Sequence, residues 1–180
     1  MKLEIDERLV ELIQNATQKA LSKLFEEHKE KFYYCSLITT GEGLCPIISA
    51  WSYEALEREA SKEEDVEDAK FYLKWSYGET PYFAYGEEYF EDVNKVFIER
   101  METLTTRKQI EKEVQLRINA MERVMYNLDK IGMFGTGEKR LEIVINAEFM
   151  PPDYTNTERA LRLNPKEALN EWLEEIAEEL

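Results

Sequence analysis

Hydrophobic residues follow two different spacings along this chain of 180 residues, and the order of these spacings limits the folds open to it. Over residues 9–25 they recur every three or four positions, which is typical of an amphipathic helix. Residues 32–40 and 44–51 are rich in aromatic and β-branched residues, and Gly41 and Gly43 supply a turn between them. These two segments are therefore expected to form a β-hairpin.

Two further segments alternate apolar and polar side chains, as strands with one buried face do. They are residues 70–77 and residues 140–148. Helices and strands do not alternate regularly along the chain, as a parallel α/β sheet would require. The sequence thus predicts a single α+β domain over residues 1–180, with a mostly antiparallel sheet of about four strands packed against N-terminal, central and C-terminal helices.

The central and C-terminal helices carry clear start signals. Thr106 and Gln109 form a capping box ahead of a long apolar stripe. Asn164 stands at the cap position and Pro165 at the first helical position of a last helix, which we expect to extend to Leu180. The two longest helices are expected to cover one face of the sheet.

Acidic residues outnumber basic ones by 38 to 23, which gives a formal net charge of -15. This charge repels nucleic-acid phosphates and anionic lipid surfaces, so neither nucleic acid nor a membrane is an expected partner. The acidity is uneven, because residues 61–100 hold 11 acidic and 5 basic residues. The sequence contains no long apolar run and does not begin with a basic and then apolar leader, so a cytoplasmic location is expected.

Residue types that carry nucleophilic or metal chemistry are scarce. The one histidine, His28, lies in a charged run that is typical of the solvated end of a helix. Cys35 and Cys45 lie on the two arms of the hairpin, where folding about Glu42 would pair Cys35 with Ser49, and we interpret both as buried thiols. No metal, nucleotide or other cofactor is expected, because the sequence lacks ligand clusters and a phosphate-binding loop between a strand and a helix.

Acidic and aromatic residues in the middle of the chain are candidate partner-binding residues. Nine aromatic rings lie within residues 71–90, and acidic residues flank them on both sides. The candidates are Asp65, Glu67, Asp68, Tyr82, Phe83, Glu87, Glu88, Glu91 and Asp92. Acidic residues early in a helix also offset the helix dipole or solvate the surface, and this alternative interpretation stays open.

Several segments spread over most of the chain carry a family resemblance. They are residues 32–37 (FYYCSL), 50–56 (AWSYEAL), 72–76 (YLKWS), 90–94 (FEDVN) and 163–165 (LNP). On these segments the chain resembles a family of uncharacterised bacterial proteins catalogued as domain of unknown function 4303. The resemblance implies no activity, cofactor or catalytic residue. By analogy, similar small acidic bacterial domains are often immunity proteins, which bind and neutralise a toxin.

These features favour a non-enzymatic binding protein, such as an immunity protein that neutralises a basic toxin or a similar basic protein partner. One alternative is an enzyme that uses carboxylates and tyrosines in a pocket between sheet and helices. Another is a homo-oligomeric structural protein. Convergent buried carboxylates with raised pKa values would favour the enzyme, whereas a flat acidic and aromatic patch would favour binding.

Overall fold

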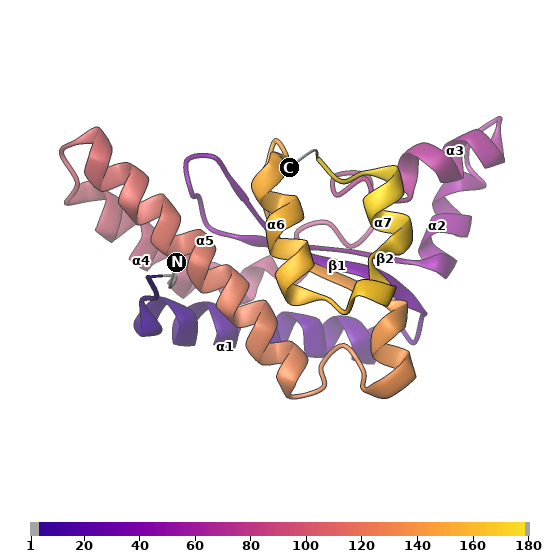
Figure 1. Ribbon diagram of the computed structural model, residues 1–180, viewed down its shortest axis with the longest axis horizontal. Helices are drawn as coiled ribbons and strands as arrows, with labels where there is room; N and C mark the ends of the chain where they lie inside the picture. Colours follow the sequence, from indigo (N-terminus) through magenta and orange to yellow (C-terminus); the bar gives the residue numbers. More distant parts are fainter. Residues whose placement is uncertain (1–3, 179–180) are drawn as a thin grey trace.

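The computed structural model, which describes residues 4–178, has an α+β fold built around a sheet of three strands (Figure 1). β1 (Phe32–Thr40) is central, with β2 (Ile47–Ser52) antiparallel on one side and β3 (Val144–Met150) parallel on the other. The predicted fold class is confirmed, but the sheet is mixed rather than mostly antiparallel. β3 runs parallel to β1 because a long crossover containing several helices separates β2 from β3.

The prediction of a strand over residues 70–77 is wrong, because this segment begins inside the helix α3 (Val66–Leu73) and ends in a loop. Ala69 and Leu73 are buried one helical turn apart, whereas Phe71 between them is 77% exposed. The apolar alternation includes Phe71, whose ring lies outside the core, so the helical spacing of the buried residues decides the structure of this segment. The described part of the chain therefore contains three of the four expected strands.

The predicted hairpin is confirmed, since β1 and β2 pair along their length. Its register differs by one residue from the expected one, because Cys35 pairs with Ala50 instead of Ser49. The midpoint of the connection therefore falls between Glu42 and Gly43 rather than on Glu42. A shift of one residue exchanges the faces to which the side chains of one strand point.

The other described helices are α1 (Glu7–Glu27), α2 (Tyr53–Ala60), α4 (Glu91–Glu102), α5 (Arg107–Lys130), α6 (Tyr154–Leu163) and α7 (Asn170–Glu175), with 3-10 turns at Glu87–Phe90, Gly137–Glu142 and Lys166–Ala168. Thr106 and Gln109 form the predicted capping box at the start of α5. Within residues 4–178, no helix combines the length and the apolar composition needed to cross a membrane.

The C-terminal helix expected to begin at Asn164 is divided into the 3-10 turn at Lys166–Ala168 and α7, and Asn164 caps neither piece. Its side-chain amide pairs instead with the backbone of Ile145, accepting from the amide N–H at 2.8 Å and donating to the carbonyl at 2.7 Å. These bonds satisfy backbone groups at the outer edge of β3, which would otherwise lack partners. The expected helix end at Leu180 lies outside the described residues.

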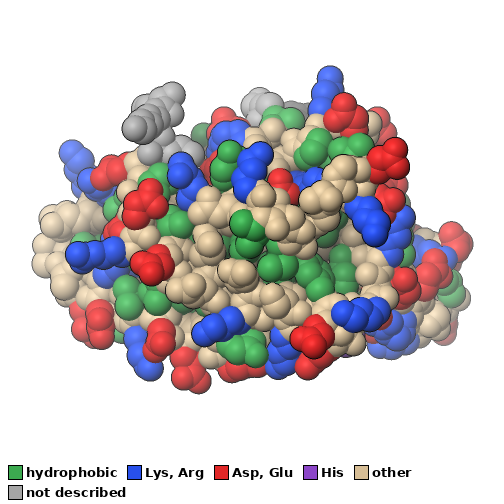
Figure 2. Space-filling model, turned by 90° about the horizontal axis from the view of Figure 1, so that it is seen from below, with side chains coloured by type: hydrophobic (Ala, Val, Ile, Leu, Met, Phe, Trp, Pro, Cys, Tyr) green, Lys and Arg blue, Asp and Glu red, His purple; other side chains and the backbone are tan. Residues whose placement is uncertain are grey.

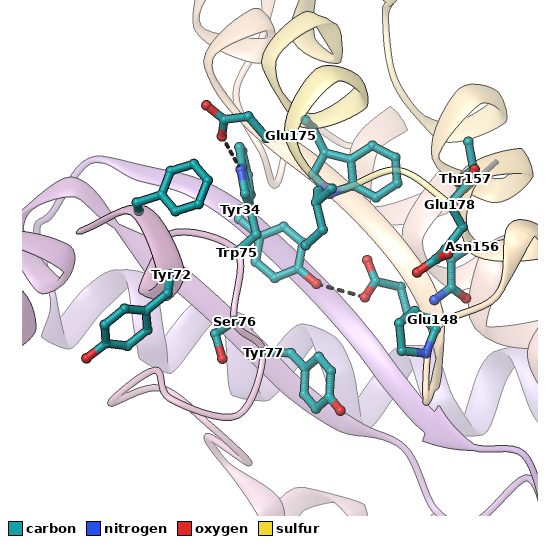
Figure 3. A pocket seen from close by; sticks show the side chains of 14 residues that line it. Tyr34, Tyr72, Trp75, Ser76, Tyr77, Glu148, Asn156, Thr157, Glu175 and Glu178 are labelled. Atoms are coloured by element: carbon teal, nitrogen blue, oxygen red, sulfur yellow. Dashed lines mark hydrogen bonds between the residues drawn. The ribbon is translucent and has the colours of Figure 1, made fainter. Parts of the chain in front are cut away.

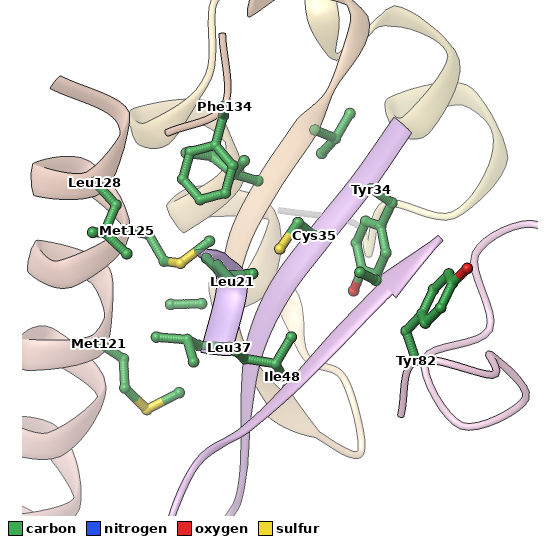
Figure 4. Packing of buried hydrophobic residues seen from close by; sticks show 14 of the residues in the cluster. Leu21, Tyr34, Cys35, Leu37, Ile48, Tyr82, Met121, Met125, Leu128 and Phe134 are labelled. Atoms are coloured by element: carbon green, nitrogen blue, oxygen red, sulfur yellow. The ribbon is translucent and has the colours of Figure 1, made fainter. Parts of the chain in front are cut away.

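The hydrophobic core lies between one face of the sheet and the two longest helices, α1 and α5, as the sequence predicts (Figure 4). From the sheet it receives Cys35, Leu37, Ile48, Ala50, Ile145 and Ala147, and from the helices it receives side chains that include Ile13, Leu21, Leu24, Met121, Met125 and Leu128. Full burial of one such aliphatic side chain stabilises the fold by roughly 1.5–3 kcal/mol. This face therefore supplies most of the apolar driving force.

The opposite face of the sheet is also buried, but most of its side chains form hydrogen bonds. It carries Tyr34, Ser36, Ser49, Trp51, Asn146 and Glu148, all of them buried. The loop after α3 crosses this face: the carbonyl of Ser76 accepts from the Trp51 indole at 2.7 Å, and the carbonyl of Tyr77 accepts from the Ser49 hydroxyl at 2.8 Å. Because buried polar groups need partners, these bonds fix the path of the loop.

Candidate functional site

A pocket of about 290 Å³ lies over the polar face of the sheet, bounded by α3 and its following loop on one side and by α6 and α7 on the other (Figure 3). Six aromatic side chains line it, namely Tyr34, Phe71, Tyr72, Trp75, Tyr77 and Trp172. The pocket thus combines elements that are distant in the sequence, as ligand sites between elements often do.

An irregularity in β1 aims two consecutive tyrosines at the pocket wall. The pairing of β1 with β2 shifts between Phe32 and Tyr34, which is typical of a β-bulge. As a result, both Tyr33 and Tyr34 pack edge-on against the Trp75 ring, with centroid distances of 5.3 and 6.0 Å. The Trp75 indole N–H in turn donates to Glu175 Oε2 at 2.6 Å, which ties the loop after α3 to α7. These contacts hold the rings in place without a ligand.

Glu148 forms part of the pocket wall at the end of β3. Its two carboxylate oxygens accept from the Tyr34 hydroxyl at 2.9 Å and from the Asn146 amide at 3.0 Å (Figure 3). Burial raises the pKa of Glu148 above its ordinary value, although these hydrogen bonds and the charge of Arg159 act in the opposite direction. An ionised carboxylate has about four acceptor sites, so the two hydrogen bonds leave capacity for a further donor.

Arg159, on α6, is a buried cation whose charge acts on Glu148. Its described hydrogen bonds are made to other groups. Its guanidinium donates to the carbonyl of Ala147 at 2.5 Å and to Asn156 Oδ1 at 2.5 Å. Burial lowers the pKa of Arg159 to about 10, which still leaves it charged at neutral pH. Arg159 therefore supports the wall of the pocket, while Glu148 lacks an ion-pair partner among the described residues.

Among the described residues, the charged side chains that line the pocket are all acidic, and they are Glu148, Glu175 and Glu178. Glu175 also binds the Lys74 ammonium at 2.9 Å, and Lys74 is not part of the described lining of the pocket. Another cavity, of about 460 Å³ beside His28, is lined by both acidic and basic residues. On the face seen in Figure 2, acidic and basic side chains are likewise interspersed around a central group of hydrophobic ones. A cavity of about 410 Å³ beside Glu87, Glu88 and Glu91 also has acidic and no basic side chains in its described lining, but it contains a single aromatic ring, Phe90. The combination of acidic residues with six aromatic rings therefore distinguishes the aromatic pocket.

One of the two predicted acidic segments lies beside this pocket. Asp65 caps α3 by accepting from the amide of Asp68 at 3.1 Å, and Glu67 pairs with Lys70 at 3.3 Å. Asp68 lies close enough to Tyr72, at the pocket rim, for its charge to act on that ring. The cap and the ion pair are structural roles, so partner binding by these residues stays a prediction.

The other acidic segment lies away from the pocket. Glu88 pairs with Lys23 of α1 at 2.9 Å and Asp92 pairs with Lys95 at 3.1 Å, while Glu87 and Glu91 are exposed beside the same 3-10 turn. In Figure 1, α3 and α4 lie toward opposite ends of the long axis. The fold therefore does not bring the two predicted acidic segments together.

The two aromatic candidates differ in their exposure. Phe83 is 44% exposed, but Tyr82 is buried and donates to Glu30 Oε2 at 2.6 Å while it accepts from Arg58 at 3.2 Å. His28, expected to be solvated, is half-buried and packs against the Tyr82 ring at 4.8 Å. The Tyr82 ring thus holds the end of α1 against the loop, and partner contact through it stays a prediction.

Neither cysteine is poised for nucleophilic chemistry. Burial raises the pKa of Cys35 strongly and raises the pKa of Cys45 to about 11, so both thiols are protonated at neutral pH. Both are free, since the hairpin register does not pair them. Within the described part of the chain, no group of three or more His, Cys, Asp or Glu side chains is arranged to hold a metal ion.

Local sequence patterns did not indicate that Tyr34, Glu148 and Trp172 share a site. Glu148 ends an alternating segment with one expected buried face, and Trp172 lies within the predicted C-terminal helix, to which no binding role was assigned. The available signal was the pair of polar residues Asn146 and Glu148 on one face of a strand that ends at two prolines. Their convergence depends on the parallel placement of β3 beside β1, which no local pattern reveals.

These features define the protein as an α+β domain with an aromatic, acidic pocket on the polar face of a mixed sheet. The chain matches the family model described as "Domain of unknown function (DUF4303)" over residues 13–165, and it belongs to this family. The match contains Tyr34, Trp75 and Glu148 but ends before Trp172. No curated protein and no solved structure matches the chain.

Proposed function

We propose that this protein is a binding protein for a basic protein partner, in the manner of an immunity protein that neutralises a basic toxin. The observation that carries the proposal is the pocket in which aromatic rings surround three carboxylates and no basic side chain contributes to the described lining. Aromatic rings beside carboxylates favour a positively charged occupant, because both the ring faces and the carboxylates attract cations.

The charge of the whole chain supports the same class of partner. A formal net charge of -15 favours approach of a basic molecule and disfavours an acidic one. Long-range attraction of this kind mainly raises the association rate, whereas buried anchors control dissociation. A basic partner would therefore be attracted by the surface and retained by contacts at the pocket.

The rim of the pocket has exposed rings that a partner can reach. Phe71 and Tyr72 stand on α3 with 77% and 51% of their surface exposed. Desolvation of the Tyr72 hydroxyl and the charges of Glu63, Asp68 and Glu79 raise its pKa. Exposed aromatic groups within a negative field are suited to contact with lysine and arginine side chains.

Acid–base catalysis in the same pocket is a second candidate function. It is favoured by Glu148, whose buried carboxyl has a raised pKa and a hydrogen bond to the Tyr34 hydroxyl. Glu175, a more exposed carboxyl of the pocket, has a lowered pKa despite its desolvation, because Lys74 and Trp75 stabilise its charged form. Because Glu148 has a raised pKa and Glu175 a lowered one, we favour binding over catalysis.

The proposal can be tested with the basic product of a gene adjacent to the one that encodes this protein. Association rates would be measured at low and high salt for the wild type and for two charge reversals of equal size. Glu67→Lys with Asp68→Lys changes the segment beside the pocket, and Glu88→Lys with Glu91→Lys changes the distant segment. We expect salt and the first reversal each to slow association by roughly tenfold, and the second reversal to have a smaller effect.

Two results would contradict this interpretation. Association that is insensitive to salt and to both reversals would exclude a basic partner attracted by charge. A larger effect of the Glu88 and Glu91 reversal would instead move the contact to the other acidic segment. The melting temperature of each variant, measured in parallel, would show that the fold is retained.

A further inference from the structure

The size and the lining of the aromatic pocket together point to one kind of occupant. We propose that it receives the guanidinium group of a single arginine side chain of the partner, an inference that rests on the proposed function and names the group that the site recognises. A volume of about 290 Å³ is at the lower end of ligand pockets and suits one long side chain rather than a folded segment.

Charge selects a cation over other occupants of this size. An anion would meet Glu148, Glu175 and Glu178 without a basic side chain in the described lining to offset them. A neutral apolar group would leave the unused acceptor sites of Glu148 without a donor. A cationic group provides both the opposite charge and the hydrogen-bond donors.

The rings favour a planar cation. Trp75 and Trp172 are mostly buried and fixed by packing, and Tyr34 is held by its hydrogen bond to Glu148. A guanidinium group is flat, is less strongly hydrated than an ammonium group, and stacks on aromatic faces while its N–H groups bind carboxylate oxygens. Fixed rings at the sides and a carboxylate within reach therefore fit arginine better than lysine.

The same wall of the pocket already binds one cation of the protein itself. The Lys74 ammonium lies 5.3 Å from the centroid of the Trp75 ring, 2.5 Å from Glu171 and 2.9 Å from Glu175. This cluster shows that the local arrangement of ring and carboxylates holds a positive group beside Trp75. It also partly neutralises Glu175, which leaves Glu148 as the main acceptor inside the pocket.

A direct test uses N-acetyl-arginine methylamide as the probe and the fluorescence of the full-length protein as the readout. Trp75 and Trp172 line the pocket, so an occupant should change their emission. The same titration with N-acetyl-citrulline methylamide, a neutral compound of nearly the same shape, isolates the contribution of charge, and sodium chloride keeps the ionic strength constant. We expect a saturable change with the arginine probe and at least tenfold weaker binding of the citrulline probe.

Variants place the probe in this pocket. Glu148→Gln keeps the size of the side chain and should weaken binding of the arginine probe by at least tenfold. Tyr72→Ala, at a largely exposed position where folding is not at risk, should weaken it several-fold. Glu88→Gln is the matched control, since it removes one carboxylate far from the pocket and should leave probe binding unchanged. Equal binding of both probes, or full binding to Glu148→Gln and Tyr72→Ala, would overturn the inference.

The pocket inference and the proposed function can fail separately. If the arginine probe does not bind while a basic partner associates in a salt-dependent manner, the pocket inference is overturned and the proposed function stands. If the probe binds with the expected preference while association of the partner is insensitive to salt and to both charge reversals, the arginine site stands and the proposed function is overturned.

Discussion

The hydrogen bond between Tyr34 and Glu148 crosses from β1 to β3 inside the polar face of the sheet, and its removal tests how that face is stabilised. The hydroxyl donates to Glu148 Oε2 at 2.9 Å, and both side chains are buried. Tyr34→Phe deletes the donor and leaves a buried carboxyl oxygen with one partner fewer. Loss of one partner of a buried polar group costs about 1–3 kcal/mol of the free energy of unfolding.

A double-mutant cycle turns this expectation into a measurement. Tyr34→Phe, Glu148→Met and the double variant would be unfolded in urea, with tryptophan fluorescence and circular dichroism as probes. Replacing both partners by apolar groups is nearly neutral compared with removing one, so the two changes should be less costly together than separately. We expect a coupling free energy of about 0.5–3 kcal/mol. At this chain length, each 1 kcal/mol corresponds to a shift of roughly 2–4 °C in the melting temperature.

Tyr33→Phe is the matched control for this cycle. Its hydroxyl donates to the carbonyl of Lys74 at 2.6 Å and has no bond to Glu148. Its cost should therefore be the same in the wild type and in the Glu148→Met background. Additivity of Tyr34→Phe and Glu148→Met within about 0.5 kcal/mol would refute the reasoning, because it would mean that the two groups do not depend on each other.

Two further changes test the buried carboxyl and a tight contact. Burial raises the folded-state pKa of Glu148 above 4.5, so its contribution to stability is present below the unfolded-state pKa and is lost as pH rises through the folded-state pKa. Urea unfolding of Glu148→Gln should therefore show a stability gain, relative to the wild type, that grows with pH. Gly86→Ala should destabilise the fold by roughly 1–3 kcal/mol, because Gly86 has a φ of +71° and a new Cβ would lie 2.6 Å from Ala20 Cβ. Gly41→Ala, at a position with open space around it, should be nearly neutral in the same urea titration.

Local sequence patterns predicted those elements whose buried residues determine the pattern. The apolar stripe of α1 and the capping box of α5 were sufficient because the same residues that create the pattern enter the core. The strand predicted near Trp75 failed for the opposite reason, since Phe71 and Tyr72 are exposed and their spacing reflects the pocket rim rather than burial. Exposed aromatic residues thus produced the alternation that is typical of a strand.

The pocket could be anticipated only in part. The density of aromatic residues after position 70 indicated a recognition surface, and Phe71 to Tyr77 do supply four of its six rings. The place of Glu148 in the pocket could not be predicted from the sequence, because a carboxylate in an alternating strand normally faces solvent. Its burial depends on α6 and on the loop after α3, which cover the second face of the sheet through contacts far apart in the sequence.

The position of Glu148 links the stability of the empty domain to its proposed affinity. A buried carboxylate is costly unless it is paired, and Arg159 directs its hydrogen bonds to a backbone carbonyl and an amide instead of to Glu148. A guanidinium group entering from the partner would supply the missing charge and donors and would favour the ionised form of Glu148. Part of the binding free energy would then offset the cost of burying this carboxylate, so a substitution that stabilises the free protein at this position is expected to weaken its binding.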